Sequence, residues 1–330
     1  MARSSKSFIK NISKPLRKIV SDASKEIMTV YENESFNTQT KMDGSPVTEA
    51  DRKAHNVIIR GLKNLTPNTP VISEESYDAS KKSPSGRYWL VDPLDGTKGF
   101  INKDGNFTVN IALIDNAVPI FGIIEAPATG KIWSGSFFQR PPRRFRLGAM
   151  FFFIGPLALF VSNIFGPISA LIFLMLFWII PWFNQHKSYG PHTVIKEKID
   201  GKLVYKDGPL RLVMSKNHQT EIDRKFLDFL TSKDIAYDLV EKGSSLKLCA
   251  LADNEADIYP RFGPTSEWDI AAGHACLIKQ GGRVCQISSG DHLTYSKEDS
   301  ILNPAFVAFR NTYLKDRYFP LISEFYKKLL

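Results

Sequence analysis

The sequence contains little cysteine and no cysteine motif that binds a metal. Its three cysteines, Cys249, Cys276 and Cys285, form no C-x-x-C pair and are odd in number, which excludes a disulfide scaffold and a zinc ribbon and favours a reducing cytosol. Internal repeats and low-complexity tracts are absent as well. With 330 residues, 43% of them hydrophobic and 23% charged, the chain has the composition of a globular protein and the length of about two domains.

Basic residues are in modest excess. The 43 Lys and Arg residues outnumber the 34 Asp and Glu residues, so the net charge of +9 suits nucleic acid, an anionic membrane or an anionic substrate. Many basic residues lie in residues 1–25, where apolar residues near helical spacing predict an amphipathic helix around Pro15. This helix either packs on the domain with a solvated basic face or contacts anionic lipid. Because other basic residues lie beside a long apolar segment, we expect no nucleic-acid partner.

Elsewhere, short strand patterns alternate with helical ones. The apolar spacing predicts strands over residues 71–73, 88–92, 107–114, 119–125 and 210–214 and helices over residues 48–62, 219–230 and 268–280. Such alternation is typical of the α/β class.

The clearest chemical motif follows the second predicted strand. Residues 89–92 are an apolar strand that ends in Asp92, and a Pro/Gly turn brings Asp95 back beside it. Two carboxylates so close repel each other, and a hard divalent cation such as Mg²⁺ is their natural partner. Gly96 and Thr97 then begin a helical turn whose free N–H groups can hold a phosphate oxygen. Alone, the motif is also typical of an aspartate-capped turn.

Three further acidic elements fit the same centre. Glu74 and Glu75 follow a predicted strand, Asp51 lies in the first turn of a predicted helix, and Asp269 opens a late helix. Each element alone is weak evidence for a site, because glutamates are common on surfaces and aspartates are common at helix starts. Only their combination indicates a site.

Together these motifs resemble the inositol monophosphatase superfamily in order and approximate spacing. The motifs are Asp43–Asp51, Ser73–Glu75, Asp92–Phe100 and Trp268–His274. Within the superfamily, Gly243–Lys247, Tyr259–Thr265 and Trp268-Asp269 are similar to the bacterial 3′(2′),5′-bisphosphate nucleotidases. Gly99 departs from the pattern, since bacterial members often have glutamate there. The resemblance covers roughly residues 8–136 and 205–310.

The resemblance implies a fold and a division of the chain. The expected fold is a layered α-β-α-β-α sandwich of the α/β class, with the active site between two subdomains and an inserted hydrophobic helical hairpin. We expect an N-terminal metal-binding subdomain over residues 1–136, an apolar insertion over 137–189 and a C-terminal substrate subdomain over 190–330.

The resemblance also implies a role for each site residue. Two or three Mg²⁺ ions would be bound by a set of oxygen ligands: Glu74, Asp92, the Leu94 carbonyl, Asp95 and Asp269. Asp51 and Thr97 would orient and deprotonate the attacking water, with Glu74 also in the catalytic set. The Gly96 and Thr97 N–H groups would hold the scissile phosphate. The rest of the substrate would contact a set in the second half of the chain: His218, Ser244, Ser245, Lys247, Arg261 and Asp269. Lys247 and Arg261 are the cations expected at the second phosphate.

A long apolar segment interrupts the resemblance. Residues 147–183 contain no charged residue, whereas about 18–20 apolar residues suffice for a membrane helix. A turn at residues 162–167 divides the segment into two arms that are short for a full crossing. Both flanks belong to one catalytic unit and arginines precede the segment, so we expect it to contact membrane lipid at the cytoplasmic face of the inner (cell) membrane. The alternative is a hydrophobic hairpin buried in a soluble protein.

The expected activity follows from the resemblance. It is Mg²⁺-dependent hydrolysis of the 3′-phosphate of adenosine 3′,5′-bisphosphate, and of 3′-phosphoadenylyl sulfate as well. Two alternatives stay open: an inositol or sugar phosphatase of the same superfamily, and a membrane-anchored scaffold that has kept the fold.

Overall fold

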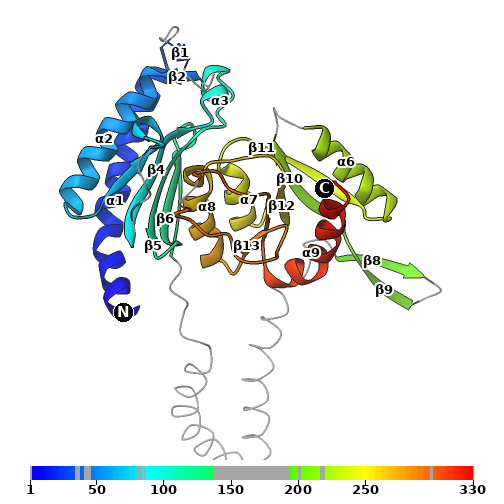
Figure 1. Cartoon of the computed structure of the whole chain (residues 1–330). Coiled ribbons are helices and arrows are strands. Elements are labelled where there is room, and N and C mark those ends of the chain that lie inside the picture. Colours follow the sequence, from blue (N-terminus) through cyan, green and yellow to red (C-terminus); the bar gives the residue numbers. More distant parts are fainter. Residues whose placement is uncertain are drawn as a thin grey trace, which may run out of the picture. The chain divides into compact units, whose positions relative to one another are not determined.

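The computed structural model describes residues 2–33, 38–40, 46–80, 84, 86–136, 194–199, 202–215, 220–297 and 300–329 (Figure 1). The chain forms two compact units, Met1–Phe138 with Pro209–Leu330, and Gln139–Gly208. In the second unit, β8 (Val194–Ile199) and β9 (Lys202–Asp207) pair as an antiparallel hairpin. All other elements of the described residues belong to the first unit. The predicted subdomain boundaries stay a prediction.

The first unit contains two five-stranded sheets. The first sheet has the order β3-β4-β5-β6-β7 and is antiparallel apart from the parallel β3–β4 pair. Its strands are β3 (Val71–Ser73), β4 (Arg87–Asp95), β5 (Thr108–Asp115), β6 (Val118–Ala126) and β7 (Lys131–Ser136). The second sheet has the order β11-β10-β12-β14-β13 and is mixed. Its strands are β10 (Leu210–Ser215), β11 (Tyr237–Lys242), β12 (Ile258–Arg261), β13 (Arg283–Gln286) and β14 (Phe306–Phe309).

Helices cover both sheets, and three apolar clusters form the core. The first cluster joins the first sheet to α1 (Ala2–Tyr31) and α2 (Glu49–Leu65). The second lies between the two sheets and includes α7 (Leu246–Ala252) and α8 (Glu267–Lys279). The third joins the second sheet to α6 (Glu221–Ser232) and α9 (Thr312–Lys327). Helices and sheets therefore alternate in layers within this unit (Figure 1).

The first sheet is buried on both faces, and alternate side chains of its strands belong to different apolar clusters. Along β4, Trp89 and Val91 belong to the cluster with α1 and α2, whereas Tyr88 and Leu90 belong to the cluster with α7 and α8. Successive side chains of a strand point to opposite faces, so a strand covered on both sides is apolar throughout. This is the continuous apolar pattern that predicts the strand from the sequence.

Helix α8 lies very close to the first sheet. A Cβ atom added at Gly122 on β6 would collide with the Ala272 backbone, and one at Gly135 on β7 would collide with the backbone of Ala275 and Cys276. Only glycine permits this approach of helix to sheet. The two glycines therefore help to place α8, and with it Asp269, over the sheet.

Four short elements complete the first unit around the site. β1 (Thr38–Thr40) pairs with β2 (Pro46–Thr48), which leads into α2. The 3₁₀ turn η1 (Glu74–Ser76) follows β3, and α3 (Thr97–Ile101) follows β4. The mixed α/β fold with two sheets is confirmed. The predicted hairpin over residues 147–183 lies outside the described residues.

The predicted location at the cytoplasmic face of the inner (cell) membrane is wrong. Among the described residues, no helix is both long and apolar enough to span a membrane. The basic N-terminal segment is α1, and its apolar face packs in the core, where Leu16 and Val20 are completely buried. Lys10, Lys14, Arg17, Lys18 and Lys25 are exposed, so these basic residues lie on the solvated side of a packed helix, the first of the two alternatives for this segment. The predicted lipid contact depends on residues 147–183, outside the described part of the chain.

Candidate active site

An irregularity in β4 brings two carboxylates to one place. β4 and β5 pair in register from Arg87 to Asp92, where Asp92 faces Asn110, and the register then shifts so that Asp95 faces Thr108. Such a bulge bends the strand and changes the direction in which its side chains point. Asp92 is 1% exposed, and its Oδ1 accepts a hydrogen bond from the Leu94 N–H at 3.1 Å. The D-x-x-D spacing thus places both side chains at the end of the same buried strand.

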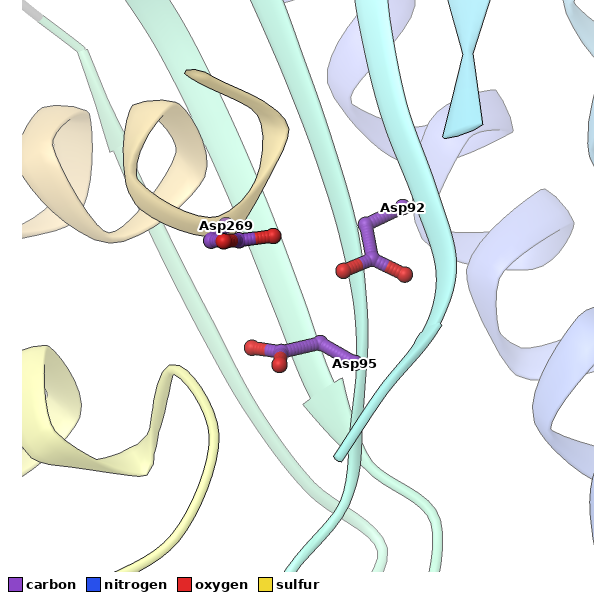
Figure 2. Close-up of side chains that lie close together, drawn as sticks. All are labelled: Asp92, Asp95 and Asp269. Carbon is purple, nitrogen blue, oxygen red and sulfur yellow. The ribbon is translucent and has the colours of Figure 1, made fainter. Parts of the chain in front are cut away.

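The third carboxylate comes from α8. Asp269 lies in the first turn of the helix, and its Oδ2 accepts a hydrogen bond from the Ser266 N–H at 2.8 Å. Carboxylate oxygens of Asp92, Asp95 and Asp269 all lie within 4.8 Å of one another (Figure 2). Asp92 and Asp95 are three positions apart in the sequence, whereas Asp269 is far away and is brought there by the packing of α8 on the sheet.

Two of the three carboxylates, Asp92 and Asp269, are in an environment that opposes their charge. Burial raises the pKa of Asp92 well above its usual range, and the charges of Glu74, Asp95 and Asp269 raise it further. Burial also raises the pKa of Asp269 well above its usual range, together with the charge of Asp95. Hard oxygen ligands at this spacing fit a divalent cation, whose charge would remove the repulsion. The chemistry of its donors therefore makes the acidic cluster a candidate metal site.

Asp51 and Thr97 lie beside the acidic cluster as a pair. The Thr97 hydroxyl is 3.5 Å from Asp51 Oδ1 and 3.3 Å from the Leu94 carbonyl oxygen. The other oxygen of Asp51, Oδ2, accepts hydrogen bonds from the N–H and the hydroxyl of Thr48, both at 2.7 Å. This capping box at the start of α2 fixes the buried carboxylate. The helix cap thus holds one oxygen of Asp51 and turns the other toward Thr97.

A cavity of about 350 Å³ opens next to these residues, a size typical of small-molecule sites. Most of the predicted site residues line it: Glu74, Asp95, Gly96, Thr97, Ser244, Ser245, Lys247, Arg261 and Asp269. Asp51 and Asp92 are buried and are not among the lining residues. His218 lies outside the described residues.

Two cations face the acidic side of this cavity. Lys247 is only 9% exposed; burial, partly offset by the charge of Asp95, lowers its pKa to about 8. Its Nζ lies 5.7 Å from the centre of the Tyr259 ring. Arg261 Nη2 donates to the Pro264 carbonyl at 3.1 Å, but its buried Nε has no hydrogen-bond partner within the part of the chain that the structure describes. A buried cationic donor without a partner indicates a place for an anion.

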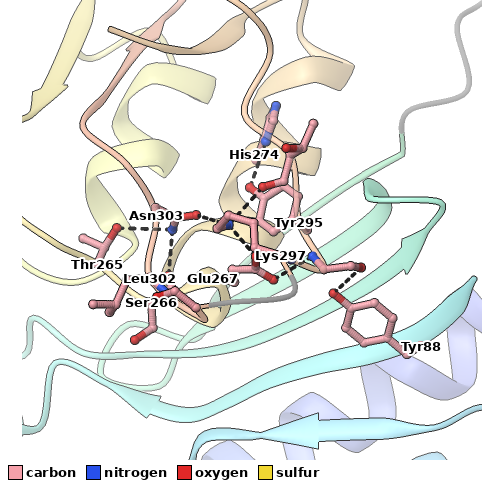
Figure 3. Close-up of polar contacts among 12 residues, drawn as sticks. Tyr88, Thr265, Ser266, Glu267, His274, Tyr295, Lys297, Leu302 and Asn303 are labelled. Carbon is pink, nitrogen blue, oxygen red and sulfur yellow. Dashed lines mark hydrogen bonds and ion pairs between the residues drawn. The ribbon is translucent and has the colours of Figure 1, made fainter. Parts of the chain in front are cut away.

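The start of α8 is held by a second polar network (Figure 3). Glu267 is completely buried; its carboxylate accepts hydrogen bonds from the Ser296 N–H at 3.0 Å and the Lys297 N–H at 3.3 Å and pairs with the Lys297 ammonium. Asn303 Nδ2 donates to the Ser266 carbonyl at 2.9 Å, and the Glu267 N–H donates to the Ile301 carbonyl. The loop after β13 therefore anchors the turn that carries Asp269.

The sequence patterns do not predict several residues of the site. Asn106 and Tyr259 line the cavity, and Thr108 and Asn110 lie behind it on β5. For Asn110 a signal exists: it is a polar residue inside a strand that is otherwise apolar on both faces. Gly96 has a positive φ of 92°, and a Cβ added there would lie 2.5 Å from the Asn106 carbonyl oxygen. The glycine after Asp95 is thus required by the backbone as well as by the cavity.

The fold and the acidic site define a class of metal-dependent phosphatases. The chain belongs to the inositol monophosphatase family, whose sequence model matches residues 9–140 and 187–323. The protein described as 3′(2′),5′-bisphosphate nucleotidase CysQ from Escherichia coli (strain K12) is 34% identical over 287 residues, which cover 86% of this chain and 94% of that protein. A protein of the same description from Buchnera aphidicola is 36% identical over 286 residues, which cover 86% of this chain and 87% of the relative.

A solved structure agrees with the sequence comparisons. The crystal structure of CysQ from Bacteroides thetaiotaomicron, described as a bacterial member of the inositol monophosphatase family, is 29% identical and superposes with a TM-score of 0.60. The superposition covers 90% of this chain and 97% of that chain. The resemblance predicted from the motifs is confirmed. The family match stops at residue 140 and resumes at residue 187, on either side of the apolar segment.

Proposed function

We propose that this protein is a Mg²⁺-dependent 3′(2′),5′-bisphosphate nucleotidase that removes the 3′-phosphate of adenosine 3′,5′-bisphosphate. The observation that carries the proposal is the pairing of opposite charges in one cavity. Three clustered carboxylates suit the cation that phosphate-ester hydrolysis needs, and two cations, the buried Lys247 and the partly buried Arg261, suit a second phosphate. The descriptions of the two curated relatives name the same activity.

The acidic residues are the proposed metal ligands. Asp92, Asp95 and Asp269 would hold Mg²⁺, with Glu74 and the Leu94 carbonyl oxygen as further ligands and two or three ions in all. The raised pKa values of Asp92 and Asp269 support this role, because a bound cation would relieve the repulsion between the carboxylates. When bound, Mg²⁺ supplies the positive charge that neutralises the phosphate and makes water a stronger nucleophile. Glu74 lines the cavity beside the substrate and completes the proposed catalytic set.

Asp51 and Thr97 are the proposed acceptors of the proton from water. Thr97 Oγ1 would accept the proton of the attacking water while its own hydroxyl proton passes to Asp51 Oδ1, the oxygen 3.5 Å away. Thr48 holds the other oxygen of the carboxylate, so the acceptor keeps its orientation during the transfer. The N–H groups of Gly96 and Thr97 would hold the scissile phosphate as charge develops on it.

The second phosphate distinguishes the proposed substrate from a simple sugar phosphate. Inositol 1-phosphate would leave Lys247 and Arg261 without an anion, whereas adenosine 3′,5′-bisphosphate or 3′-phosphoadenylyl sulfate would neutralise them. Ser244 and Ser245 line the same cavity. A contact between His218 and the nucleotide stays a prediction.

The test compares two substrates on the full chain. Phosphate release from adenosine 3′,5′-bisphosphate and from inositol 1-phosphate is measured with Mg²⁺ and with EDTA. We expect Mg²⁺-dependent release with kcat/KM far higher for the nucleotide. Preference for inositol 1-phosphate would keep the metal site and contradict the substrate assignment. No release from either would favour a scaffold that has kept the fold.

A further inference from the structure

A buried asparagine connects the acidic cluster to the turn that lines the substrate cavity. Asn110 on β5 is 1% exposed. Its Nδ2 donates to Asp95 Oδ2 at 3.2 Å and to Ser245 Oγ at 3.0 Å, and its Oδ1 accepts from the Thr108 hydroxyl at 3.0 Å. Both polar atoms of the amide are therefore engaged with residues of the site and its support.

Ser245 makes further hydrogen bonds to residues of the acidic cluster. It is 3% exposed, and its backbone N–H donates to Asp95 Oδ2 at 2.7 Å. Its hydroxyl donates to the backbone carbonyl of Asp269 at 2.6 Å while accepting from Asn110. One serine thus contacts two residues of the acidic cluster, one at the end of β4 and one on α8.

We propose that Asn110 and Ser245 form a clamp that positions the metal-binding carboxylates and couples them to the substrate cavity. The inference rests on the proposed function, because it assigns the acidic cluster to the metal. Two donors on Asp95 Oδ2 fix the rotation of the carboxylate within the acidic cluster. The hydrogen bond to the Asp269 carbonyl fixes the distance between α8 and β4. Asn110 and Ser245 are positioning residues, since they act on the ligands and not on the reacting atoms.

The residue before Ser245 in the sequence connects the clamp to the wall of the substrate cavity. Ser244, which has a positive φ of 52°, has its hydroxyl 2.6 Å from the Thr108 hydroxyl. Gly243 N–H donates to Asn106 Oδ1 at 3.3 Å, so the whole turn is attached to β5 and to the loop before it. A change in the clamp therefore moves both the metal ligands and the cavity wall. Lys247, on α7, lines the cavity, and among the described residues no hydrogen bond joins its side chain to Asn110 or Ser245. Its loss therefore removes a proposed substrate contact without removing a support of the metal ligands.

The experiment separates positioning from simple structural support. Mg²⁺ binding to the metal-free full chain is measured by calorimetry without substrate for the wild type, Asn110→Ala, Ser245→Ala and Lys247→Ala. KM for adenosine 3′,5′-bisphosphate and thermal stability are measured for the same set. Asn311→Ala is the matched control, because Asn311 is a buried asparagine that caps α9 through a hydrogen bond from the Leu314 N–H.

We expect Asn110→Ala to raise the Mg²⁺ Kd about 10-fold or more, as is typical when a support of a metal ligand is removed, and to raise KM as well. Asn311→Ala should lower thermal stability without changing the Mg²⁺ Kd. Lys247→Ala should raise KM without raising the Mg²⁺ Kd, because it removes a cation that interacts with Asp95 and Asp269. If Asn110→Ala does not fold, Ser245→Ala, which removes only a hydroxyl, is expected to raise the Mg²⁺ Kd severalfold.

Two results would overturn the clamp. Normal Mg²⁺ affinity in both clamp variants, with a loss of stability like that of Asn311→Ala, would show that Asn110 and Ser245 only support the fold. Wild-type protein that binds no Mg²⁺ would remove the proposed function and the clamp together. Normal metal binding with no nucleotide hydrolysis would contradict the substrate alone, and a raised Kd in the variants would then still support the clamp.

Discussion

At the scale of single residues, the acidic cluster makes the metal-free protein less stable at neutral pH. The pKa of Asp92 is raised in the folded state by burial and by the charges of Glu74 and its neighbours. A carboxyl group whose pKa is higher in the folded than in the unfolded chain binds protons more tightly when folded, so ionising it at neutral pH costs stability. A bound cation reverses this effect, and the cluster therefore links metal binding to stability.

Replacing Asp92 with asparagine separates catalysis from folding. We expect Asp92→Asn to abolish phosphate release, because a proposed metal ligand is lost, and to leave the Tm in EDTA unchanged or higher, because one repelling charge is gone. The amide oxygen can still accept from the Leu94 N–H. Wild-type protein should gain about 2.7 kcal/mol of stability when Mg²⁺ is present at 100 times its Kd, and the variant should not.

The measurement is thermal unfolding of both proteins with EDTA and with Mg²⁺. An equal Mg²⁺-induced rise in Tm for wild type and Asp92→Asn would exclude Asp92 as a ligand. A large fall of the variant's Tm in EDTA would show that the carboxylate stabilises the metal-free fold.

Lys247 provides a prediction for pH. Its pKa is lowered to about 8, chiefly by burial, so the ammonium is charged below that pH and neutral above it. We expect KM for adenosine 3′,5′-bisphosphate to rise as the pH passes about 8, because the second phosphate loses its cation. Lys247→Arg should remove this rise, since a guanidinium stays charged throughout the range.

A truncation of the same side chain tests its assignment. Lys247→Ala should raise KM for the bisphosphate roughly 10- to 100-fold, which corresponds to the free energy of one charged hydrogen bond. It should change KM for adenosine 3′-monophosphate much less. Equal losses on both substrates would refute a contact between Lys247 and the second phosphate.

At the scale of elements, the start of α8 is fixed by a buried ion pair. Glu267 is completely buried, and Lys297 on the following loop supplies its charge partner. Glu267→Gln would leave the partly buried ammonium without a carboxylate, and we expect it to cost about 2 kcal/mol of unfolding free energy. Because this turn carries Asp269, the Mg²⁺ Kd should rise in the same variant.

Urea denaturation at neutral pH measures this cost. Glu49→Gln is the matched control, since Glu49 pairs with Lys53 at 2.8 Å on the exposed face of α2 and its loss should have no measurable effect. A Glu267→Gln protein as stable as this control would show that the buried pair does not anchor α8.

The elements themselves were partly predictable from the sequence. The strand patterns at residues 107–114 and 119–125 differ by one residue at each end from β5 and β6, because both strands are long and apolar on both faces. The helix pattern at 268–280 likewise matches α8 within one residue. Strands β12, β13 and β14 are only four residues long and were not predicted. Their pairing is set by tertiary contacts, which a short local pattern does not contain.

The site residues, like the elements, were only partly predictable from the sequence. Asp92 and Asp95 form a local motif, so their proximity could be predicted from a strand and a turn. The position of Asp269 beside them followed only from the family resemblance, since the sequence does not show how α8 packs on the sheet. Asn110 was missed because its one local signal, a polar residue inside an apolar strand, does not identify its partners Ser245 and Asp95, which come from other elements.

At the scale of the whole molecule, the two halves of the chain build one site. Residues before the apolar segment supply Asp51, Asp92 and Asp95, and residues after it supply Lys247 and Asp269, all within the same compact unit. A segment between them can vary without altering the site, as long as both flanks return to the same unit. The incorrect prediction of a membrane location came from the uncharged segment at residues 147–183 and the arginines before it, a pattern read along the sequence alone.

The most direct measurement is the identity of the product formed from adenosine 3′,5′-bisphosphate by the purified full chain with Mg²⁺. Chromatography of the reaction mixture separates adenosine 5′-monophosphate from adenosine 3′-monophosphate. Our account predicts adenosine 5′-monophosphate and free phosphate in equal amounts, with no product in EDTA or with Asp92→Asn. Release of the 5′-phosphate, or release that persists in EDTA, would contradict it.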